Sequence, residues 1–302
     1  MIDVAVVGSL HLDIMVEAPR LPGREETLMG ESWHYKCGGK GGNQAVAAAR
    51  FGARTSFGGR VGSDDFGERL VAHLRSAGVD TRHVGVDSLT GSGMSVAIQE
   101  ADGEYGAVAV PGANKNIAAS SIAGDWAALW VCSVLLLQNE IPEAVNIAAA
   151  NLAKAHKAKV LLNAAPARSM PDQLLDLVDV LIINRVEAAM LAGFQITTPA
   201  DAERAATAFT TEKRDVIVTL GKDGLVLRTR AGYLCRVPAR SVEVISSHGA
   251  GDCFCGALAA QLARHGNLEA ACRYGSKAAA MFVSTPAAGK SDVNDAALGR
   301  WL

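Results

Sequence analysis

The sequence has 302 residues, of which 49% are hydrophobic and 20% are charged, and its formal net charge is -2. A chain of this size and composition can bury a full hydrophobic core, which excludes a disordered or fibrous protein. The near-neutral charge, with no run of like-charged residues, leaves no electrostatic surface for nucleic acid or an anionic membrane. We therefore expect a globular protein whose partner is a small molecule.

The cysteines and the first residues bear on the compartment. The 6 cysteines are dispersed and include no Cys-x-x-Cys pair, which argues against a zinc site or a redox motif. Residues 1–7 have neither a cationic lead nor a cleavage pattern and predict a first strand, not a signal peptide. No apolar run reaches the ~18 residues that a membrane helix needs. These features predict a cytoplasmic protein with reduced thiols.

Short apolar runs rich in β-branched residues alternate with alanine-rich stretches along the chain. This alternation is typical of a mainly parallel sheet covered by helices on both faces. Core strands are predicted at residues 4–7, 131–137, 160–162, 178–183 and 216–220. Helices are predicted at residues 43–50, 65–76, 143–155, 200–209, 253–263 and 268–282. The predicted fold is a doubly wound α/β sheet in a single domain over residues 1–302.

Four other segments alternate apolar and polar residues, like strands that are wetted on one face. They are residues 13–17, 27–36, 94–100 and 106–110. Asp102 and Gly103 predict a hairpin turn between the last two. Because these segments are inserted between core elements, they predict a small separate sheet that forms a lid over the mouth of the main sheet.

The strongest local motif is Gly249-Ala250-Gly251-Asp252, which leads directly into a predicted helix. Small residues at a helix start leave backbone N–H groups uncovered, and the helix dipole makes them an anion site that suits a phosphoryl group. Beside it, the carboxylate of Asp252 could accept a proton from an attacking hydroxyl. Judged from the spacing alone, Asp252 could equally be a plain helix cap.

A second glycine cluster, residues 37–44, runs into the helix predicted at 43–50. Bare backbone at Gly39 lets a polyol approach closely, while Lys40 and Asn43 can donate to its hydroxyls. The cluster is not a Walker loop, because the required first glycine and the Ser or Thr after the lysine are both missing. A flexible loop that caps a helix is the alternative.

Single polar residues after predicted strands complete the candidates. Asp13 and Glu140 could accept hydrogen bonds from sugar hydroxyls at the carboxyl ends of strands. Asn184 and Glu187, one helical turn apart, suit a hydrated Mg²⁺ with nucleotide phosphates, although a plain cap at Asn184 is an equal alternative. Residues 219–224 are compatible with either a hairpin or a nucleotide cradle.

Taken in order, these segments resemble the ribokinase-like family of carbohydrate and nucleoside kinases, from the first strand to about Ser291. The resemblance rests on six motifs, at residues 38–44, 60–67, 163–168, 184–187, 219–224 and 249–252. It implies an ATP-dependent kinase acting on the primary hydroxyl of a pentose-like sugar, ribose to ribose 5-phosphate, with Mg²⁺ and a lid that forms a homodimer contact. A nucleoside kinase and a non-catalytic sugar-binding sensor are the alternatives.

The resemblance also implies roles for single residues. Sugar contacts would come from His11, Asp13, Gly39, Lys40, Asn43 and Glu140. Nucleotide contacts would come from Asn184, Thr219, Gly221, Gly224 and Ser276, with Glu187 organising the waters of Mg²⁺. The anion hole would be Gly249, Ala250 and Gly251, with Asp252 as the base.

Three departures from the family pattern stand out. His11 replaces an asparagine among the sugar contacts, Arg185 replaces an acidic residue, and residues 246–248 replace Asp-Thr-Thr. The resemblance implies a monovalent-cation site at Ser246, His248 and Ser291. Because serine offers only a neutral oxygen where the family has a carboxylate, we predict weak or absent activation by K⁺.

Overall fold

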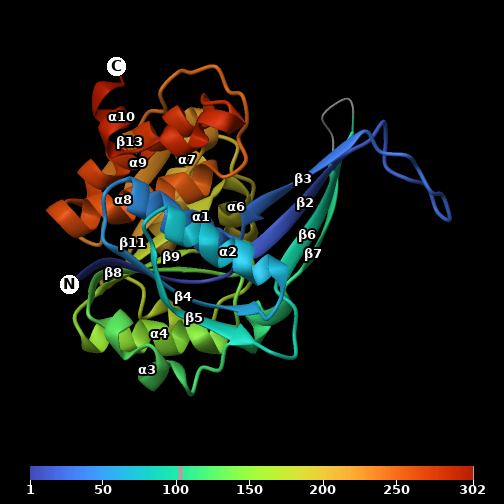
Figure 1. Cartoon of the computed structure of the whole chain (residues 1–302). Helices are drawn as coiled ribbons and strands as arrows, with labels where there is room; N and C mark the ends of the chain where they lie inside the picture. The colour runs from blue at the N-terminus through green and yellow to red at the C-terminus, as the bar shows by residue number, and fades with distance from the viewer. Residues whose placement is uncertain (101–104, 302) are drawn as a thin grey trace.

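The computed structural model describes residues 1–100 and 105–301, which form two sheets (Figure 1). The larger sheet contains β1 (Ile2–Val7), β4 (Thr55–Gly62), β5 (Asp80–Asp87), β8 (Cys132–Gln138), β9 (Lys159–Asn163), β10 (Val180–Asn184), β11 (Asp215–Thr219), β12 (Leu225–Arg228) and β13 (Leu234–Val237). Its strand order is β13-β12-β11-β10-β9-β8-β1-β4-β5. All pairs from β11 to β5 are parallel, whereas β12 and β13 pair antiparallel at one edge.

Helices cover both faces of this sheet. One face carries α1 (Lys40–Arg50), α2 (Asp65–Ser76), α8 (Ala250–His265), α9 (Leu268–Val283) and α10 (Asp295–Arg300). The other carries α3 (Ile122–Asp125), α4 (Glu143–Ala155), α5 (Asp172–Leu175), α6 (Arg185–Ala192) and α7 (Pro199–Phe209). Successive strand residues point to opposite faces, so Val4 and Val6 pack into the first core and Ala5 and Val7 into the second. The doubly wound α/β prediction is confirmed.

The five core strands predicted from the sequence all exist, but four strands of the larger sheet escaped prediction. Gly58 and Gly59 interrupt the apolar pattern of β4, and β5 is a largely polar edge strand. The strands β12 and β13 are short and follow the turn at residues 219–224. That turn joins the antiparallel pair β11 and β12, so the hairpin alternative is right for the backbone.

The second sheet is the predicted lid. It contains β2 (His11–Glu17), β3 (Ser32–Gly38), β6 (Gly93–Gln99) and β7 (Tyr105–Val110) in the order β3-β2-β6-β7, and it projects from the body of the molecule (Figure 1). The strand β3 begins at Ser32, later than the expected residue 27, because residues 27–31 form no strand. The hairpin turn expected at Asp102 and Gly103 lies outside the described residues.

The lid strands β2 and β3 join the core at one crossing. Residues 8–10 separate β1 from β2, and Gly39 alone separates β3 from α1. Gly39 has a φ of 83°, and a Cβ there would lie 2.8 Å from both the backbone nitrogen of His11 and the backbone oxygen of Ser9. Only glycine fits both the conformation and the space, which holds the two connections against each other.

None of the helices in the described part of the chain is long and apolar enough to cross a membrane.

Candidate active site

The candidate site lies where the parallel strands of the larger sheet end. A cavity of about 180 Å³ is lined by residues from α1, β10, β11, α6 and α8. The predicted residues that line it are Lys40, Asn184, Glu187, Thr219, Gly249, Gly251 and Asp252. Segments that are far apart in the sequence therefore meet at the carboxyl ends of the strands, as expected for an open α/β sheet.

Asp252 is buried and held by side chains of α1. Its Oδ2 accepts from Asn43 Nδ2 and its Oδ1 from Gln44 Nε2, both at 3.0 Å. Gln44 is oriented in turn by Gln138, whose Nε2 donates to Gln44 Oε1 at 2.8 Å. Burial raises the pKa of Asp252, while the charge of Lys40 and the amide donors oppose the rise. The site thus holds a desolvated carboxylate of increased basicity.

The position of Asp252 in its helix decides between the two readings of its motif. The helix α8 begins at Ala250, before the predicted residue 253, and its N-cap is Gly249 with a φ of 87°. Asp252 therefore lies inside the first turn, and its carboxylate oxygens accept from another helix. The plain-cap alternative is wrong, and the carboxylate remains available to a ligand in the cavity.

The three small residues before Asp252 do not contribute equally to the cavity. Gly249 and Gly251 line it. A Cβ placed on Gly251 would meet nothing within 4 Å, so the backbone there faces open space. The N–H of Ala250 already donates to the carbonyl of Ser247 at 3.1 Å, and this residue lines the neighbouring cavity.

Glu140 joins the second glycine cluster to the end of β8. Its Oε2 accepts from the hydroxyl of Ser9 and, at 2.8 Å, from the backbone N–H of Lys40. The carboxylate therefore fixes the entry to α1, directly beside Asn43. The glycine cluster is thus a built element of the site, and the flexible-loop alternative is wrong.

Two predicted sugar residues come from the lid. Asp13 lies within β2 and not at the end of a core strand, because β1 already ends at Val7; its Oδ1 accepts from Ser95 Oγ at 2.6 Å. His11 begins the same strand, and its Nε2 is buried without a hydrogen-bond partner in the described residues. The lid therefore supplies one carboxylate and one unsatisfied imidazole nitrogen.

A second, larger cavity of about 400 Å³ adjoins the first and shares Thr219, Gly251 and Phe254 with it. The predicted nucleotide residues Gly221, Gly224 and Ser276 line this second cavity. Much of the remaining lining is apolar, which suits a flat aromatic base. These residues are Leu225, Val242, Val244, Ala279, Ala280 and Val283.

Arg185 and the backbone hold the turn that closes this cavity. The Nη2 of Arg185 donates to Asp223 Oδ2 at 2.6 Å, and its Nη1 donates to the carbonyl of Ile196 at 3.1 Å. Gly224 has a φ of 84°, and a Cβ there would lie 2.1 Å from the carbonyl oxygen of Val237. The departure from the family pattern at position 185 thus places a cation on the turn and not in the cavity lining.

Asn184 and Glu187 form a reciprocal capping box at the start of α6. Asn184 Oδ1 accepts from the N–H of Glu187 at 2.9 Å, and Glu187 Oε2 accepts from the N–H of Asn184 at 2.8 Å. The cap alternative is therefore right, yet both residues also line the first cavity. Burial raises the pKa of Glu187. In the described residues no group of three or more His, Cys, Asp or Glu could hold a metal ion by itself.

The expected cation site at Ser246, His248 and Ser291 lies beside positive charges. Burial lowers the pKa of His248, and the charges of Lys36, Lys40 and Lys290 lower it further. A neutral imidazole therefore precedes Gly249 near pH 7.

Sequence reasoning missed the amides and lysines that depend on tertiary contacts. Gln44 and Gln138 position Asp252 from two other elements, and only Gln44 stands within a recognised motif. The charges of Lys36, in the lid, and of Lys290, in the segment before α10, lower the pKa of His248, and no spacing signal marks either lysine.

The fold and the two adjoining cavities suit a phosphotransferase. The model of the pfkB family carbohydrate kinases matches residues 1–295. A ribokinase from Haemophilus influenzae is 33% identical over 289 residues, which cover 95% of this chain and 94% of the relative. A deoxyribokinase from Salmonella typhi is 32% identical over 291 residues, which cover 95% and 93%.

The solved structures agree. Arabidopsis thaliana ribokinase complexed with ribose and ATP aligns with a TM-score of 0.91 at 27% identity, covering 99% of this chain and 98% of that one. The chain therefore belongs to the pfkB family of carbohydrate kinases. It is an ATP-dependent sugar kinase, which confirms the resemblance seen in the sequence.

Proposed function

We propose that this kinase transfers the γ-phosphoryl group of ATP to the primary hydroxyl of a pentose-like sugar, with Asp252 as the base. The observation that carries the proposal is the environment of Asp252. A buried carboxylate that accepts only from neutral amides lies beside the start of α8, in a cavity that opens into a larger apolar one. A carboxylate in that position can take a proton from the acceptor as the phosphoryl group arrives.

The backbone at Gly249 and Gly251 would face the transferring phosphoryl group. Their N–H groups and the dipole of α8, a helix of 16 residues, stabilise the charge that spreads over its oxygens in the in-line transition state. Removing one preorganised donor of this kind typically costs about 3 kcal/mol of transition-state stabilisation. Lys40, which lines the same cavity, adds a positive charge next to this group.

The donor nucleotide fits the larger cavity. Thr219, Gly221, Gly224 and Ser276 line it together with apolar residues. Mg²⁺ would supply positive charge to the phosphates, and Glu187 would hold it through water, since its carboxylate lines the first cavity and the described residues contain no group of three or more metal ligands.

The sugar would bind between the lid and the start of α1. The carboxylates of Asp13 and Glu140 can accept from its hydroxyls, and His11 offers a buried nitrogen that has no partner among the residues the structure describes. Relatives named ribokinase and deoxyribokinase support a pentose, and ribose is the first acceptor to test. Exposed Trp33 and Val108 on the lid support the proposal that two lids meet in a homodimer.

The test is a coupled ADP-release assay with MgATP and a panel of pentoses, hexoses and nucleosides. We expect a pentose to be turned over and Asp252→Asn to abolish most of that turnover. A nucleoside used ~10-fold more efficiently than every sugar, or ~1.4 kcal/mol of transition-state preference, would assign the enzyme to nucleosides instead. Sugar binding without ADP release from any acceptor would indicate a sensor.

A further inference from the structure

A third cavity of about 210 Å³ lies at the edge of the larger sheet that β5 forms. It is slightly larger than the first cavity, and it shares no lining residue with the first or the second. Its walls come from β4, from β5 and from residues 117–126, which include α3. A ligand in this cavity would therefore bind without touching the residues proposed for phosphoryl transfer.

The pairing of β4 with β5 forms one wall. Gly58 is paired with His83 and Arg60 with Gly85, so these four residues lie on one face of the sheet. This face belongs to the second core, because Val7, which pairs with Gly58 from β1, packs into that core. Since the two glycines have no side chains, this part of the wall presents Arg60 and His83.

Gly85 leaves the space in front of this wall open. Beyond the adjacent residues, a Cβ at this position would find its nearest atom, the carbonyl oxygen of Gly59, at 3.8 Å, and Arg60 Nη1 at 4.0 Å. At Gly58, by contrast, a Cβ would lie 3.1 Å from the ring of Trp126, which already fills the space there. The open space therefore lies over Gly85, and the guanidinium of Arg60 borders it.

Arg60 offers its two terminal nitrogens to this space. Its Nε donates to Asp87 Oδ2 at 3.1 Å, whereas Nη1 and Nη2 donate to no group in the described residues. Asp87 is itself fixed, because it also accepts from Asn116 Nδ2 at 2.9 Å and from the N–H groups of Leu89 and Thr90. A guanidinium that is held through Nε presents a planar fork, which matches the oxygens of an anionic group.

His83 adds a nitrogen without a partner. Its Nε2 is buried and forms no hydrogen bond with any residue that the structure describes. A buried polar atom that is left unpaired destabilises the protein, and a ligand that pairs with it removes this cost. Arg82 also lines the cavity, but Asp80 already engages its Nε and Nη2. Arg60 and His83 are therefore the two groups that gain most from a ligand.

The opposite wall combines apolar side chains with two polar ones. Ile117, Ile122 and Trp126 form a surface on which the C–H groups of a sugar ring can pack. Ser121 and Asp125 supply a hydroxyl and an exposed carboxylate. A bare anion gains nothing from the carboxylate of Asp125, whereas hydroxyl groups can donate to it. The lining thus suits a molecule that carries both an anionic group and hydroxyls.

We propose that this third cavity is a second ligand site and that it binds a phosphorylated sugar. The phosphate accepts from Arg60 and His83, the hydroxyls donate to Asp125, and the ring packs on the apolar wall. A phosphate suits these donors better than a carboxylate, because its three terminal oxygens can reach donors on two different strands. The site goes beyond the proposed function, since none of its residues takes part in the transfer.

Binding is measured with the kinase site occupied. Calorimetry on the protein saturated with ribose, Mg²⁺ and a non-hydrolysable ATP analogue compares glucose 6-phosphate and ribose 5-phosphate with glucose, gluconate and inorganic phosphate at matched ionic strength. We expect at least one sugar phosphate to bind ~10-fold or more tightly than any of the other three compounds. Absence of binding by both sugar phosphates would overturn the site. Equal binding of gluconate would overturn the preference for phosphate, and equal binding of inorganic phosphate would overturn the role of the sugar.

Two variants then assign the binding to the cavity. Gly85→Val fills the space beside Arg60 and leaves the contact between Arg60 and Asp87 in place. Arg60→Gln removes the guanidinium and leaves the space open. Each variant should weaken the binding of the sugar phosphate ~10-fold or more. Binding that persists in both variants occurs elsewhere on the protein and would overturn the site.

Each variant has a matched control. Gly299→Val places the same side chain on a glycine of α10, where a Cβ would meet nothing within 4 Å. Arg236→Gln breaks an ion pair with Glu203 from β13, the strand at the other edge of the sheet. Both controls should bind the sugar phosphate as tightly as the unchanged protein.

Steady-state kinetics separate this site from the kinase function. Without added sugar phosphate, kcat/KM for ribose should not change in Gly85→Val or Arg60→Gln, because neither residue lines the first or the second cavity. Loss of binding in both variants, in a protein that phosphorylates no sugar, would support the second site and overturn the proposed function. Unaltered binding in both variants would overturn the second site even in an active kinase.

Discussion

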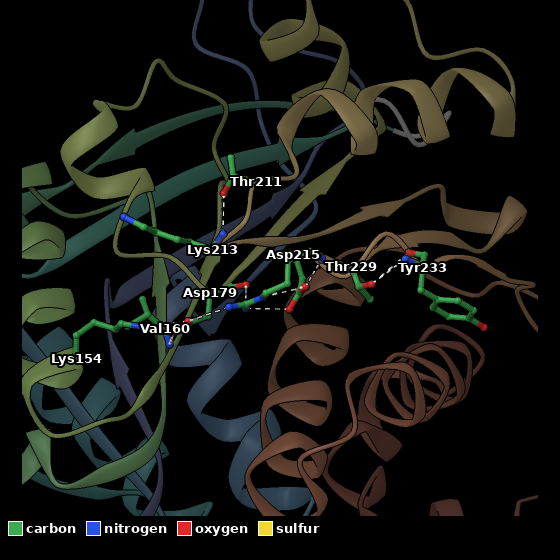
Figure 2. Close-up of polar contacts among 9 residues, drawn as sticks. Lys154, Val160, Asp179, Thr211, Lys213, Asp215, Thr229 and Tyr233 are labelled. Atoms are coloured by element: carbon green, nitrogen blue, oxygen red, sulfur yellow. Dashed lines mark hydrogen bonds and ion pairs between the residues drawn. The ribbon is translucent and has the colours of Figure 1, made fainter.

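The two ends of the parallel strands in the nine-stranded sheet hold their charged residues in different ways. At the end where the parallel strands begin, the carboxylates of Asp179 and Asp215 each meet a cation (Figure 2). Asp179 accepts from Lys154 Nζ at 2.9 Å and from the N–H of Val160 at 2.8 Å. Asp215 accepts from Arg230 Nη2 at 3.0 Å and is buried beside it. These charged groups already have partners, and their contacts hold neighbouring strands together.

Around the candidate site, where the central strands end, two carboxylates accept hydrogen bonds from neutral donors only. Asp252 accepts from Asn43 and Gln44, and Glu140 from the hydroxyl of Ser9 and the N–H of Lys40. A charge that is paired with an opposite charge has already recovered part of its desolvation cost, whereas one held by neutral donors still gains from a ligand. The comparison teaches that the partner of a buried charge, more than its burial, distinguishes a functional residue from a structural one.

The largest effect on turnover is expected at Asp252, the buried carboxylate held by neutral donors. Asp252→Asn should lower kcat by ~10²–10⁴-fold, because the amide keeps the shape of the side chain but cannot accept the proton. The KM for the sugar should stay within several-fold, since the acceptor hydroxyls are bound by other residues. Steady-state kinetics on the purified variant measure both constants, and an unchanged kcat would remove Asp252 from the role of base.

Substitutions of the ion-paired residues where the parallel strands begin should lower the stability of the protein and leave its turnover unchanged. Asp179→Ala leaves the N–H of Val160 and the ammonium of Lys154 without their partner, which should cost about 1–3 kcal/mol of unfolding free energy. Denaturant unfolding measures the loss, and kcat/KM should not change. Arg82→Ala, which breaks an exposed pair with Asp80, is the matched control and should have no measurable effect. A kinetic defect in Asp179→Ala would break the comparison.

The pH dependence of turnover sharpens the reading of Asp252. Its pKa is raised by burial, so the proton binds more tightly in the folded protein than to an ordinary aspartate with a value of 3.8. A base must be deprotonated, so kcat should fall as the pH drops through this raised pKa, by about tenfold per pH unit in the acid limb. A profile of kcat against pH checks it, and an acid limb at or below 3.8 would contradict the prediction.

A smaller effect on kinetics is expected from Arg185. This cation is paired with Asp223, although it lies near the end of the sheet that carries the candidate site. Arg185→Ala removes the contacts to Asp223 and to the carbonyl of Ile196 that hold the turn at residues 219–224. The KM for ATP should rise by about 3–10-fold, in line with the loss of roughly 1 kcal/mol, and the KM for the sugar should not change. A rise confined to the sugar KM would show that the residue acts at the acceptor.

The smallest effect concerns monovalent cations. Because Ser246 brings no charge and the cation Lys290 directly precedes Ser291, another residue of the expected cation site, K⁺ should raise turnover by less than ~5-fold. Turnover in Tris buffer with 0 to ~100 mM KCl, against tetramethylammonium chloride at matched ionic strength, separates binding from screening. A saturable increase of ~5-fold or more that is specific to K⁺ would contradict the prediction.

The parts of the fold that could be predicted are those in which burial leaves a local pattern. The strands β1, β8 and β10 are buried on both faces and are therefore continuous apolar runs. The edge strand β5 is exposed along part of its length, and β4 contains glycines, so neither carries such a run. The lid was predicted from its alternating residues, but the start of β3 is set by pairing with β2, which leaves no local signal.

The site follows the same rule. The motif around Asp252 could be recognised because its glycines and its carboxylate are contiguous in the sequence. The amides that hold Asp252 could not be assigned, since Gln138 and Gln44 are 94 residues apart and Gln44 and Asp252 are 208 apart.

Gly39, the single residue between the lid and α1, bears on how much ATP is hydrolysed without a sugar acceptor. Since Gly39 alone separates β3 from α1, the lid is joined directly to the helix that carries Asn43 and Gln44, the two donors that hold Asp252. Water competes with the sugar as a phosphoryl acceptor, and it cannot hold the lid down. We therefore expect hydrolysis of ATP to be slow in the absence of sugar.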